Sequence, residues 1–311
     1  MDYELKFQFK LYQNHFRQLL QTSHGVWRVR EGIIISLTNS AGITSQGEIA
    51  PLPWFGSETL DQAKEFCQQV GETINQEQIM AIPDCLPCCQ FALESAYLAL
   101  KKPQIVSIQD QDLDFCYLLP AGEKALTAWQ DLLINSSATT LKWKIGVLPL
   151  EQELKILSQL SSAVSSEIKL RLDANGGLSL SQAQKLLSLT DNLPNIEFIE
   201  QPLAPERLTE MRQLSQTYST LLALDESVAS FRQLQQVHQA GWQGVFVIKA
   251  AIMGFPSRLI QFCQNNALDF VFSSVLETDV ARQTVLNLTQ QLNHPRALGF
   301  GVQHLYVRTT S

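Results

Sequence analysis

Long apolar runs and clustered positive charge are both missing from this sequence of 311 residues. No run approaches the 18 apolar residues of a membrane-spanning helix, and the first residues lack a basic segment leading into an apolar one. Acidic residues outnumber basic ones by 30 to 23, and the lysines and arginines are scattered, which argues against a surface for nucleic acid or an anionic membrane. We therefore expect a cytoplasmic protein that binds a small-molecule carboxylate, with no protein partner implied.

Cysteine and histidine are also scarce, with 6 and 5 residues. Cys85, Cys88 and Cys89 form a C-x-x-C pattern, but no second pair at suitable spacing completes a zinc site. A proline lies inside the pattern and an amphipathic stretch follows it, so we interpret this segment as the start of a helix with buried thiols. No spacing typical of a nucleophile or a metal site relates the histidines, among them His24, His238, His294 and His304.

The chain divides into two regions with different patterns. Residues 1–112 begin with strands and continue with helices near 57–75 and 87–100, which predicts an α+β capping domain. Residues 113–300 alternate strand and helix, which predicts a TIM barrel of the (β/α)8 type, in its modified (β/α)7β form. We expect the tail, about 301–311, to join the capping domain. The eight predicted barrel strands cover 115–119, 140–145, 168–172, 196–199, 221–224, 245–248, 270–272 and 297–300.

Carboxylates stand at the ends of three consecutive predicted strands of the barrel. Asp173, Glu200 and Asp225 each follow a short apolar run, and about 25 to 30 residues separate one from the next. Because such residues converge on one mouth of a barrel, we expect the three side chains to share one cavity. One such residue alone could simply cap the following helix, but three in register favour hard oxygen ligands for Mg²⁺.

Lysines flank the same predicted cavity on two sides. Lys142 and Lys144 alternate with Trp143, so the period of a strand places both ammonium groups on one face. Lys249 ends the predicted strand 245–248 on the other side. Ammonium groups held near one another and near a divalent cation tend to have lowered pKa values, which suits a base near neutral pH. The alternatives are salt bridges at the barrel mouth and, for Lys142, only an assisting role.

A metal ion that binds a carboxylate, with lysines on both sides, suits removal of the proton α to that carboxylate. Such a proton is very weakly acidic, and the negative charge that develops needs a cation already in place. A lysine or histidine base with one or two Mg²⁺ ions is the arrangement of the enolase superfamily.

Five motifs together resemble that superfamily, in the muconate-lactonizing enzyme subgroup with lysines on the second and sixth strands. The motifs are Lys142-Trp143-Lys144, Asp173-Ala174-Asn175, Glu200-Gln201-Pro202, Asp225-Glu226-Ser227 and Ile248-Lys249. Within the subgroup, the short chain and the segments 272–278 and 296–302 are similar to the o-succinylbenzoate synthase family. One departure is Ala250, where that family commonly has proline, which puts loop geometry in question rather than catalysis.

The resemblance implies a carbon–oxygen lyase, more narrowly a hydro-lyase. Members of that family carry out a Mg²⁺-dependent syn dehydration of 2-succinyl-6-hydroxy-2,4-cyclohexadiene-1-carboxylate to 2-succinylbenzoate, in menaquinone and phylloquinone biosynthesis, and we expect Mn²⁺ to substitute. The resemblance implies Asp173, Glu200 and Asp225 as metal ligands. It also implies Lys144 as the base and Lys249 as the cation facing the developing charge.

Two further residues follow the metal-ligand motifs directly or nearly so. Asn175 is expected to support the metal ligands or orient the substrate, and Glu226 to pair with a lysine. Ordinary loop hydrogen bonding is an equal alternative for both residues.

In the resembling family, loops of the capping domain close over the barrel mouth and select the substrate. Two segments are candidates here, 22–26 and 51–56, and the second carries Trp54 and Phe55, which can cover a ring and exclude water. Packing at the junction of cap and barrel is an equally good interpretation of these aromatic residues. We expect further substrate contacts from Lys142, Ser273, Ser274 and the backbone N–H of Gly254.

Other functions are compatible with the same barrel. In an N-succinylamino acid racemase or a dipeptide epimerase, two lysines on opposite faces exchange one proton, and both lysines are present here. Dipeptide epimerases typically carry Asp-x-Asp near the eighth strand, and residues 299–302 contain none. A catalytically silent barrel acting as a binding or scaffold protein is disfavoured, because decay usually erodes the set of ligands that is complete here.

Overall fold

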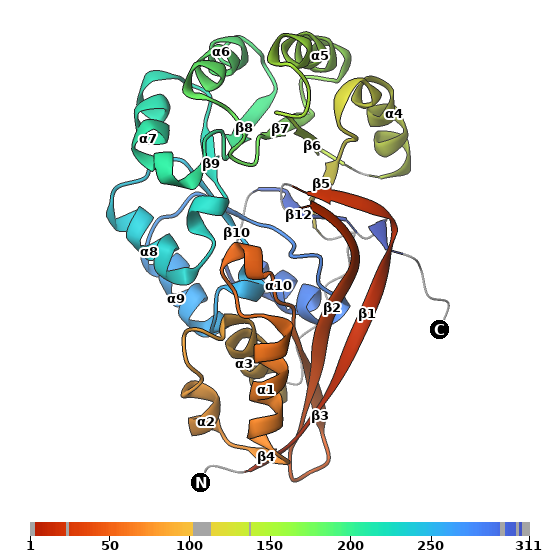
Figure 1. Ribbon diagram of the computed structural model, residues 1–311, viewed down its shortest axis with the longest axis vertical. Helices are drawn as coiled ribbons and strands as arrows, with labels where there is room; N and C mark the ends of the chain where they lie inside the picture. The colour runs from red at the N-terminus through yellow and green to blue at the C-terminus, as the bar shows by residue number, and fades with distance from the viewer. Residues whose placement is uncertain are drawn as a thin grey trace.

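The computed structural model describes residues 4–22, 25–101, 113–136, 138–292, 296–302 and 305–306 of the chain. Within them, a small antiparallel sheet with three helices lies against a larger parallel sheet ringed by helices. Figure 1 shows the long hairpin of strands β1 (Leu5–Thr22) and β2 (Gly25–Thr38) rising from the small group along one side to the mouth of the larger one.

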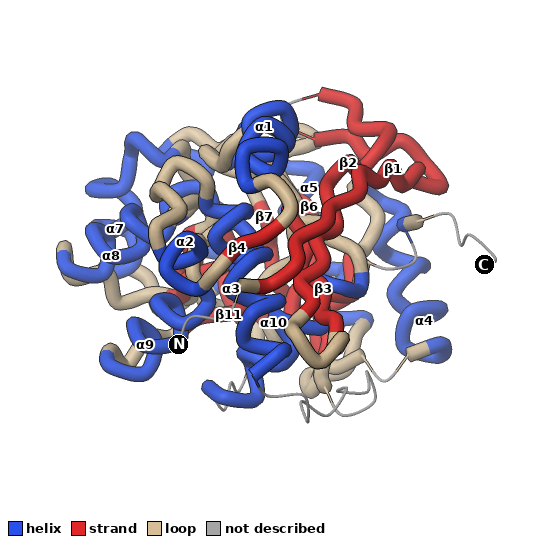
Figure 2. The backbone as a smooth tube through the Cα atoms, turned by 90° about the horizontal axis from the view of Figure 1, so that it is seen from below, coloured by secondary structure: helices blue, strands red, loops and turns tan. Residues whose placement is uncertain are grey.

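The small sheet has the strand order β3-β2-β1-β4, where β3 is Thr44–Ile49 and β4 is Thr73–Ile74. Every second residue of β2 faces inward, and Ile33, Ile35 and Leu37 are fully buried as that alternation requires. Helix α3 (Pro87–Lys101) contacts β2 and β3, as the view from below in Figure 2 also shows. The other two helices are α1 (Leu60–Val70) and α2 (Gln76–Met80).

The predicted parallel barrel is confirmed, with the strand order β11-β10-β9-β8-β7-β6-β5-β12. An isolated parallel bridge between Ser273 and Gly299 closes the ring between β11 and β12. The strands are β5 (Phe115–Leu118), β6 (Thr140–Lys144), β7 (Lys169–Asp173), β8 (Ile196–Glu200), β9 (Leu222–Leu224), β10 (Val245–Ile248), β11 (Phe270–Phe272) and β12 (Leu298–Gly301).

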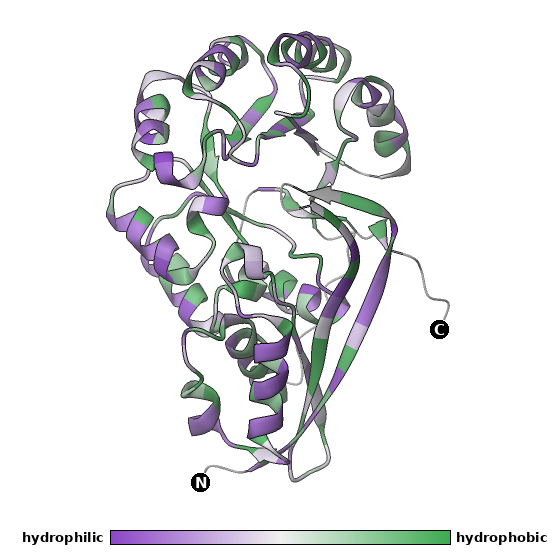
Figure 3. Cartoon of the chain, viewed as in Figure 1, coloured by the Kyte–Doolittle hydropathy of each residue, from purple (hydrophilic) through white to green (hydrophobic). Residues whose placement is uncertain are grey.

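Each of the first seven barrel strands is followed by a helix on the outside of the ring. These are α4 (Ala125–Asn135), α5 (Leu150–Ala163), α6 (Leu180–Thr190), α7 (Leu208–Thr217), α8 (Phe231–Gln239), α9 (Pro256–Asn265) and α10 (Asp279–Leu292). Single-turn 3-10 helices are η1 (Pro53–Phe55), η3 (Gly122–Lys124), η4 (Pro205–Arg207), η5 (Glu226–Val228) and η6 (Ala250–Ile252). In Figure 3 the outer helices α5 and α6 carry both hydrophilic and hydrophobic stretches, as helices with one face in water should. Within the described residues, no helix combines the length and apolarity that crossing a bilayer requires.

An ion network fills the barrel below the site. Arg171 Nε lies 2.6 Å from Glu197 Oε2, and Arg296 Nη1 lies 2.6 Å from the other oxygen of the same carboxylate. Arg296 also forms an ion pair with Asp269, with 2.6 Å between Nη2 and Oδ2. These contacts connect β7, β8 and the segments before β11 and β12. They therefore stabilise the part of the barrel that supports the mouth.

The predicted buried thiols are observed. All six cysteines are free, five of them are buried, and Cys85 is exposed. Burial raises the pKa of Cys88 well above its ordinary value, which keeps this thiol protonated and unreactive. The predicted domain boundary at residue 112 falls outside the described residues and stays a prediction. His24, His294 and His304, for which no functional role is expected, also lie outside the described residues.

Candidate active site

Three carboxylates meet at the mouth of the barrel, where β7, β8 and β9 end. Asp173 and Glu200 are the last residues of β7 and β8 and pair in register, and Asp225 directly follows β9. All three residues are buried. The chain turns away abruptly behind the first two, because Asn175 and Gln201 have φ values of 42° and 39°, a left-handed backbone that non-glycine residues adopt rarely and often at functional sites.

Lys142 lies between two of these carboxylates. Its Nζ is 2.8 Å from Asp173 Oδ2 and 2.8 Å from Glu200 Oε1. Burial lowers the pKa of Lys142, but the charges of Asp173, Glu200 and Asp225 outweigh it and raise that pKa well above its ordinary value. These carboxylates alone keep Lys142 protonated, and the lowered lysine pKa expected beside a bound divalent cation stays a prediction.

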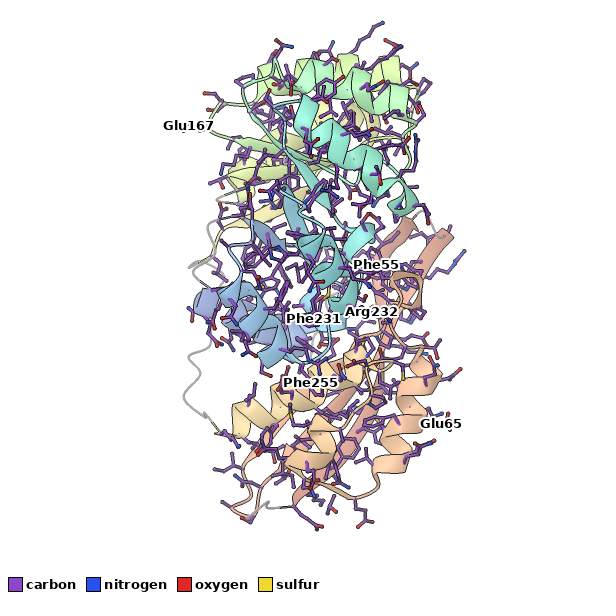
Figure 4. All side chains as sticks on the ribbon, turned by 90° about the vertical axis from the view of Figure 1, so that its left-hand side faces the viewer. Phe55, Glu65, Glu167, Phe231, Arg232 and Phe255 are labelled. Carbon is purple, nitrogen blue, oxygen red and sulfur yellow. The ribbon has the colours of Figure 1, made fainter. Side chains whose placement is uncertain are left out.

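Lys249 follows β10 on the opposite side of the mouth and contacts the carboxylate of Asp225. Its ammonium group also lies over the ring of Phe55, 4.1 Å from the ring centroid, a cation–π distance. Phe55 belongs to the small-sheet region, and Figure 4 places it where that region meets the barrel. Lys249 is thus buried between a barrel carboxylate and an aromatic ring of the cap.

Lys144 stands apart from these pairs. It faces the same cavity as Lys142, two residues along β6, because Trp143 between them points away and is fully buried. Among the described residues, Lys144 makes no ion pair or side-chain hydrogen bond. A lysine that lines a cavity without a bound partner is available to take a proton from a ligand there.

Gln201 orients the loop that carries Asp225, a role that the sequence analysis missed. Its Oε1 accepts hydrogen bonds from Asp225 N at 3.0 Å and Ser227 N at 3.1 Å. Its Nε2 donates to Ser227 Oγ at 2.8 Å and Leu203 O at 2.9 Å, and the residue is fully buried. Nothing in the sequence distinguishes this glutamine from an exposed one except its place after Glu200.

The carboxylates of Asp173, Glu200 and Asp225 are the oxygen donors that this site offers to a divalent cation. Within the described residues, no three acidic, histidine or cysteine side chains stand close enough together, as they lie, to hold an ion, because Asp173, Glu200 and Asp225 contact lysines instead. Burial and the nearby charge of Asp173 raise the pKa of Glu200 to about 7, and burial, which the charge of Lys249 only partly offsets, raises that of Asp225 to about 6. Buried oxygen donors that repel one another favour added positive charge, so the residues present fit Mg²⁺.

Asn175 and Glu226 form a polar pair at the edge of the same site. Asn175 Nδ2 donates to Glu226 Oε1 at 3.1 Å, and Asn175 N donates to Asp173 Oδ1 at 3.0 Å. Burial raises the pKa of Glu226 and the charge of Lys249 partly offsets this, so the expected lysine acts on Glu226 through its charge while the hydrogen bond comes from the amide. Asn175 Oδ1 and Glu226 Oε2 are buried without a partner, and both residues line the cavity, so these two oxygens can still accept hydrogen bonds from a ligand.

A cavity of about 840 Å³ lies over these groups, between the barrel mouth and the cap. Its lining includes all the predicted metal-ligating and catalytic residues, together with Lys142, Trp54, Ser273 and Ser274. The prediction for Gly254 is not supported, because this residue does not line the cavity. A Cβ at Gly254 would lie 2.5 Å from Gln90 Oε1, so its backbone packs against α3 of the cap.

Several cavity residues were not singled out from the sequence. Arg17 and Trp27 reach the cavity from the hairpin, and Arg171 reaches it from the barrel floor. Arg171 follows the same inward period as Asp173, which was the signal that could have identified it. The hairpin residues carry no such signal, because their approach to the barrel depends on how the cap docks.

Comparison with known proteins places both parts of the chain. Residues 124–298 match the family model described as enolase C-terminal domain-like, and residues 11–100 match the model of the MenC N-terminal domain. Among curated proteins, an o-succinylbenzoate synthase of Thermosynechococcus vestitus is 37% identical over 302 residues, 96% of this chain and 92% of that protein. An o-succinylbenzoate synthase of Yersinia pseudotuberculosis is 28% identical over 279 residues, 86% of this chain and 81% of that protein.

Solved structures agree with these matches. The crystal structure of o-succinylbenzoate synthase from Thermosynechococcus elongatus, with magnesium in the active site, superposes with a TM-score of 0.91 at 37% identity, over 97% of this chain and 94% of that one. The L-Ala-D/L-Glu epimerase of Bacillus subtilis superposes with a TM-score of 0.82 at 18% identity, over 99% of this chain and 92% of that one. The second likeness shows the shared fold alone.

Proposed function

Because this chain belongs to the o-succinylbenzoate synthase family of the enolase superfamily, we propose that it dehydrates 2-succinyl-6-hydroxy-2,4-cyclohexadiene-1-carboxylate to 2-succinylbenzoate, a step towards menaquinone or phylloquinone. The observation that carries the proposal is the pair Lys144 and Lys249. They lie on two sides of one cavity that also holds three buried carboxylates. The enzyme is accordingly a hydro-lyase.

We propose that Asp173, Glu200 and Asp225 hold Mg²⁺, and that Mn²⁺ can replace it. When bound, the ion lowers the energy of the negative charge that develops on the substrate carboxylate. Lys249 lies beside Asp225 and supplies a second positive charge from the opposite face. Asn175 and Glu226 keep the loops behind two of the ligands in place.

Lys144 carries the proton in both directions. As a neutral amine it removes the proton α to the carboxylate, and the resulting ammonium group then returns that proton to the departing hydroxyl, which leaves as water. Lys144 is therefore restored in each turnover. The ring becomes aromatic in the same step, so the protein has to supply mainly orientation, one base and positive charge.

The cap excludes water from this chemistry. Trp54 and Phe55 of the loop 51–56 cover the cavity, and Ser273 and Ser274 offer hydroxyl groups to the succinyl part of the substrate. We propose that residues 1–112 with the tail 301–311 form this capping domain and that 113–300 form the barrel. The small molecule is the partner that the site implies, in a cytoplasmic setting.

Loss of the diene absorbance, followed with purified protein and Mg²⁺, tests the assignment. Lys144→Ala should lose at least about a hundredfold in rate, because a positioned acid–base group contributes roughly that much or more. Lys185→Ala is the matched control, since Lys185 is an exposed lysine paired with Glu151 on the surface. Chelation of the metal should also abolish conversion, and Lys144→Ala should still bind Mg²⁺ in calorimetry.

Two results would contradict the proposal. Full activity of Lys144→Ala would show that another group is the base. A wild-type protein that leaves the diene untouched, but exchanges the α-proton of N-succinylamino acids in heavy water, would instead be a racemase with the same barrel chemistry.

A further inference from the structure

The chain returns to the capping hairpin after the last barrel strand. Tyr306 forms an antiparallel bridge with Phe16 of β1, and the two rings stack with 5.2 Å between their centroids. Arg17 Nε donates a hydrogen bond of 2.6 Å to Tyr306 O. Three separate contacts therefore hold Tyr306 on the hairpin.

The hydroxyl of Tyr306 bonds to the barrel instead. It donates to Leu276 O, a carbonyl that also accepts a hydrogen bond of 3.1 Å from Arg30 Nε. Leu276 has a φ of 60°, a left-handed backbone that is unfavourable for a leucine. Two donors on one carbonyl keep this turn in place. Burial raises the pKa of Tyr306, so its hydroxyl stays protonated and able to donate.

The turn at Leu276 shapes one wall of the cavity. Leu276 N donates to Ser274 Oγ at 2.8 Å, and that hydroxyl donates to Glu277 Oε2 at 2.8 Å. Ser273, Ser274 and Leu276 all line the cavity. A shift of the Leu276 carbonyl would therefore move the hydroxyl groups that face the substrate.

The contact of Tyr306 with the hairpin continues, through a chain of aromatic rings, to the wall of the cavity that the cap provides. Phe16 packs edge to face against Trp27 at 5.2 Å, and Trp27 packs in the same way against Trp54 at 5.0 Å. Both tryptophans line the cavity. Tyr306 thus joins the aromatic wall of the cap to the serine wall of the barrel, beside Arg30 of β2, which bonds the same carbonyl.

We propose that Tyr306 is a positioning residue for substrate binding, which ties the capping hairpin to the barrel loop 273–277 and fixes the distance between the two walls around the succinyl group. The inference rests on the proposed function. Tyr306 touches none of the reacting groups, so its hydroxyl acts on binding rather than on proton transfer.

Tyr306→Phe removes the hydroxyl and keeps the ring, and Tyr97→Phe is the matched control. The hydroxyl of Tyr97 bonds to Gln76 Oε1 inside the cap, and Tyr97 does not line the cavity. In Tyr306→Phe, KM for the diene and Kd for 2-succinylbenzoate should rise roughly three- to tenfold, the effect of one lost hydrogen bond. We expect kcat to stay within about twofold and Mg²⁺ affinity to stay unchanged. Tyr97→Phe should match the wild type in all four quantities.

Phe16→Leu loosens the same contact from the hairpin side and should weaken product binding in the same direction. Unchanged KM and Kd in Tyr306→Phe, beside an active wild type, overturn this inference alone. So does an equal change in Tyr97→Phe. A wild type that neither converts the diene nor binds 2-succinylbenzoate overturns the proposed function, and this inference with it.

Discussion

Glu277 is a carboxyl group that the fold buries beside the cavity loop. Burial, the largest effect, raises its pKa from 4.5 to about 7. Between these two pH values the folded protein keeps a proton on Glu277 that the unfolded chain has lost, so the contribution of this group to stability is fully present below about pH 4.5 and is lost as the pH rises through about 7. We expect this residue to remove up to about 3 kcal/mol of unfolding free energy between pH 4.5 and 8.

Urea unfolding of Glu277→Gln at several pH values measures this contribution. The glutamine stays neutral and can still accept from Val275 N and Ser274 Oγ, so the variant should lose that part of the pH dependence and exceed the wild type at pH 8. Glu123→Gln is the control, because Glu123 is exposed. Parallel pH profiles for wild type and Glu277→Gln would show that Glu277 ionises freely in the folded state.

Single residues also mark where prediction from the sequence succeeded and failed. The convergence of Asp173, Glu200 and Asp225 could be predicted because the end of a parallel strand fixes direction as well as position. The substrate contact expected from Gly254 was not found at the cavity, because the direction in which a loop backbone N–H points depends on the docking of the neighbouring helix. The charge state of Lys142 depends on two carboxylates that lie far from it in sequence, and strand spacing does not give their distances.

At the scale of elements, the alternation of strand and helix in the sequence was nearly sufficient to predict the bounds of the barrel strands. Strands 245–248 and 270–272 have the predicted bounds, and the other six differ by one residue at one end or at both ends. Ser179 precedes α6 and forms a complete capping box with Gln182, a helix start that the Ser-x-x-Gln spacing indicates. The short helix α2 was missed, because five residues give too few turns for a helical pattern.

Glu153 shows how one helix supports the catalytic strand next to it. Its carboxylate, on α5, accepts hydrogen bonds of 2.8–2.9 Å from Gly146 N, Val147 N and Leu148 N, the loop that follows Lys144. Glu153→Ala would remove these three hydrogen bonds to a charged group, and should lower the unfolding free energy by about 3 kcal/mol. Urea denaturation measures the change.

The same helix offers the control for that experiment. Glu151 lies two residues earlier, is exposed, and pairs only with Lys185, so Glu151→Ala should change the unfolding free energy by less than about 1 kcal/mol. Similar losses in the two variants would mean that the loop after β6 does not depend on Glu153.

At the scale of the whole molecule, the active site exists only where the cap is docked on the barrel. Glu48, fully buried on β3 of the cap, makes several polar contacts across this junction. It accepts hydrogen bonds from Thr278 N at 2.9 Å and Ala281 N at 3.1 Å, at the start of α10, and from Tyr12 Oη at 2.5 Å on the hairpin. A carboxylate at a helix N-terminus also interacts favourably with the helix dipole.

Glu48→Ala should therefore weaken the junction rather than either part. We expect a loss of about 3–5 kcal/mol, because a buried charge with several donors is removed and those donors stay unpaired. In calorimetry, the single transition expected of the wild type should separate into two, and kcat/KM should fall because the cavity loses its cap wall. Glu31→Ala, at an exposed position of the same sheet, should keep one transition at the wild-type temperature. A single, unshifted transition in Glu48→Ala would mean that the other contacts across the junction, among them those of Glu94 with Ser257 and of Arg30 with Leu276, hold the cap on the barrel without Glu48.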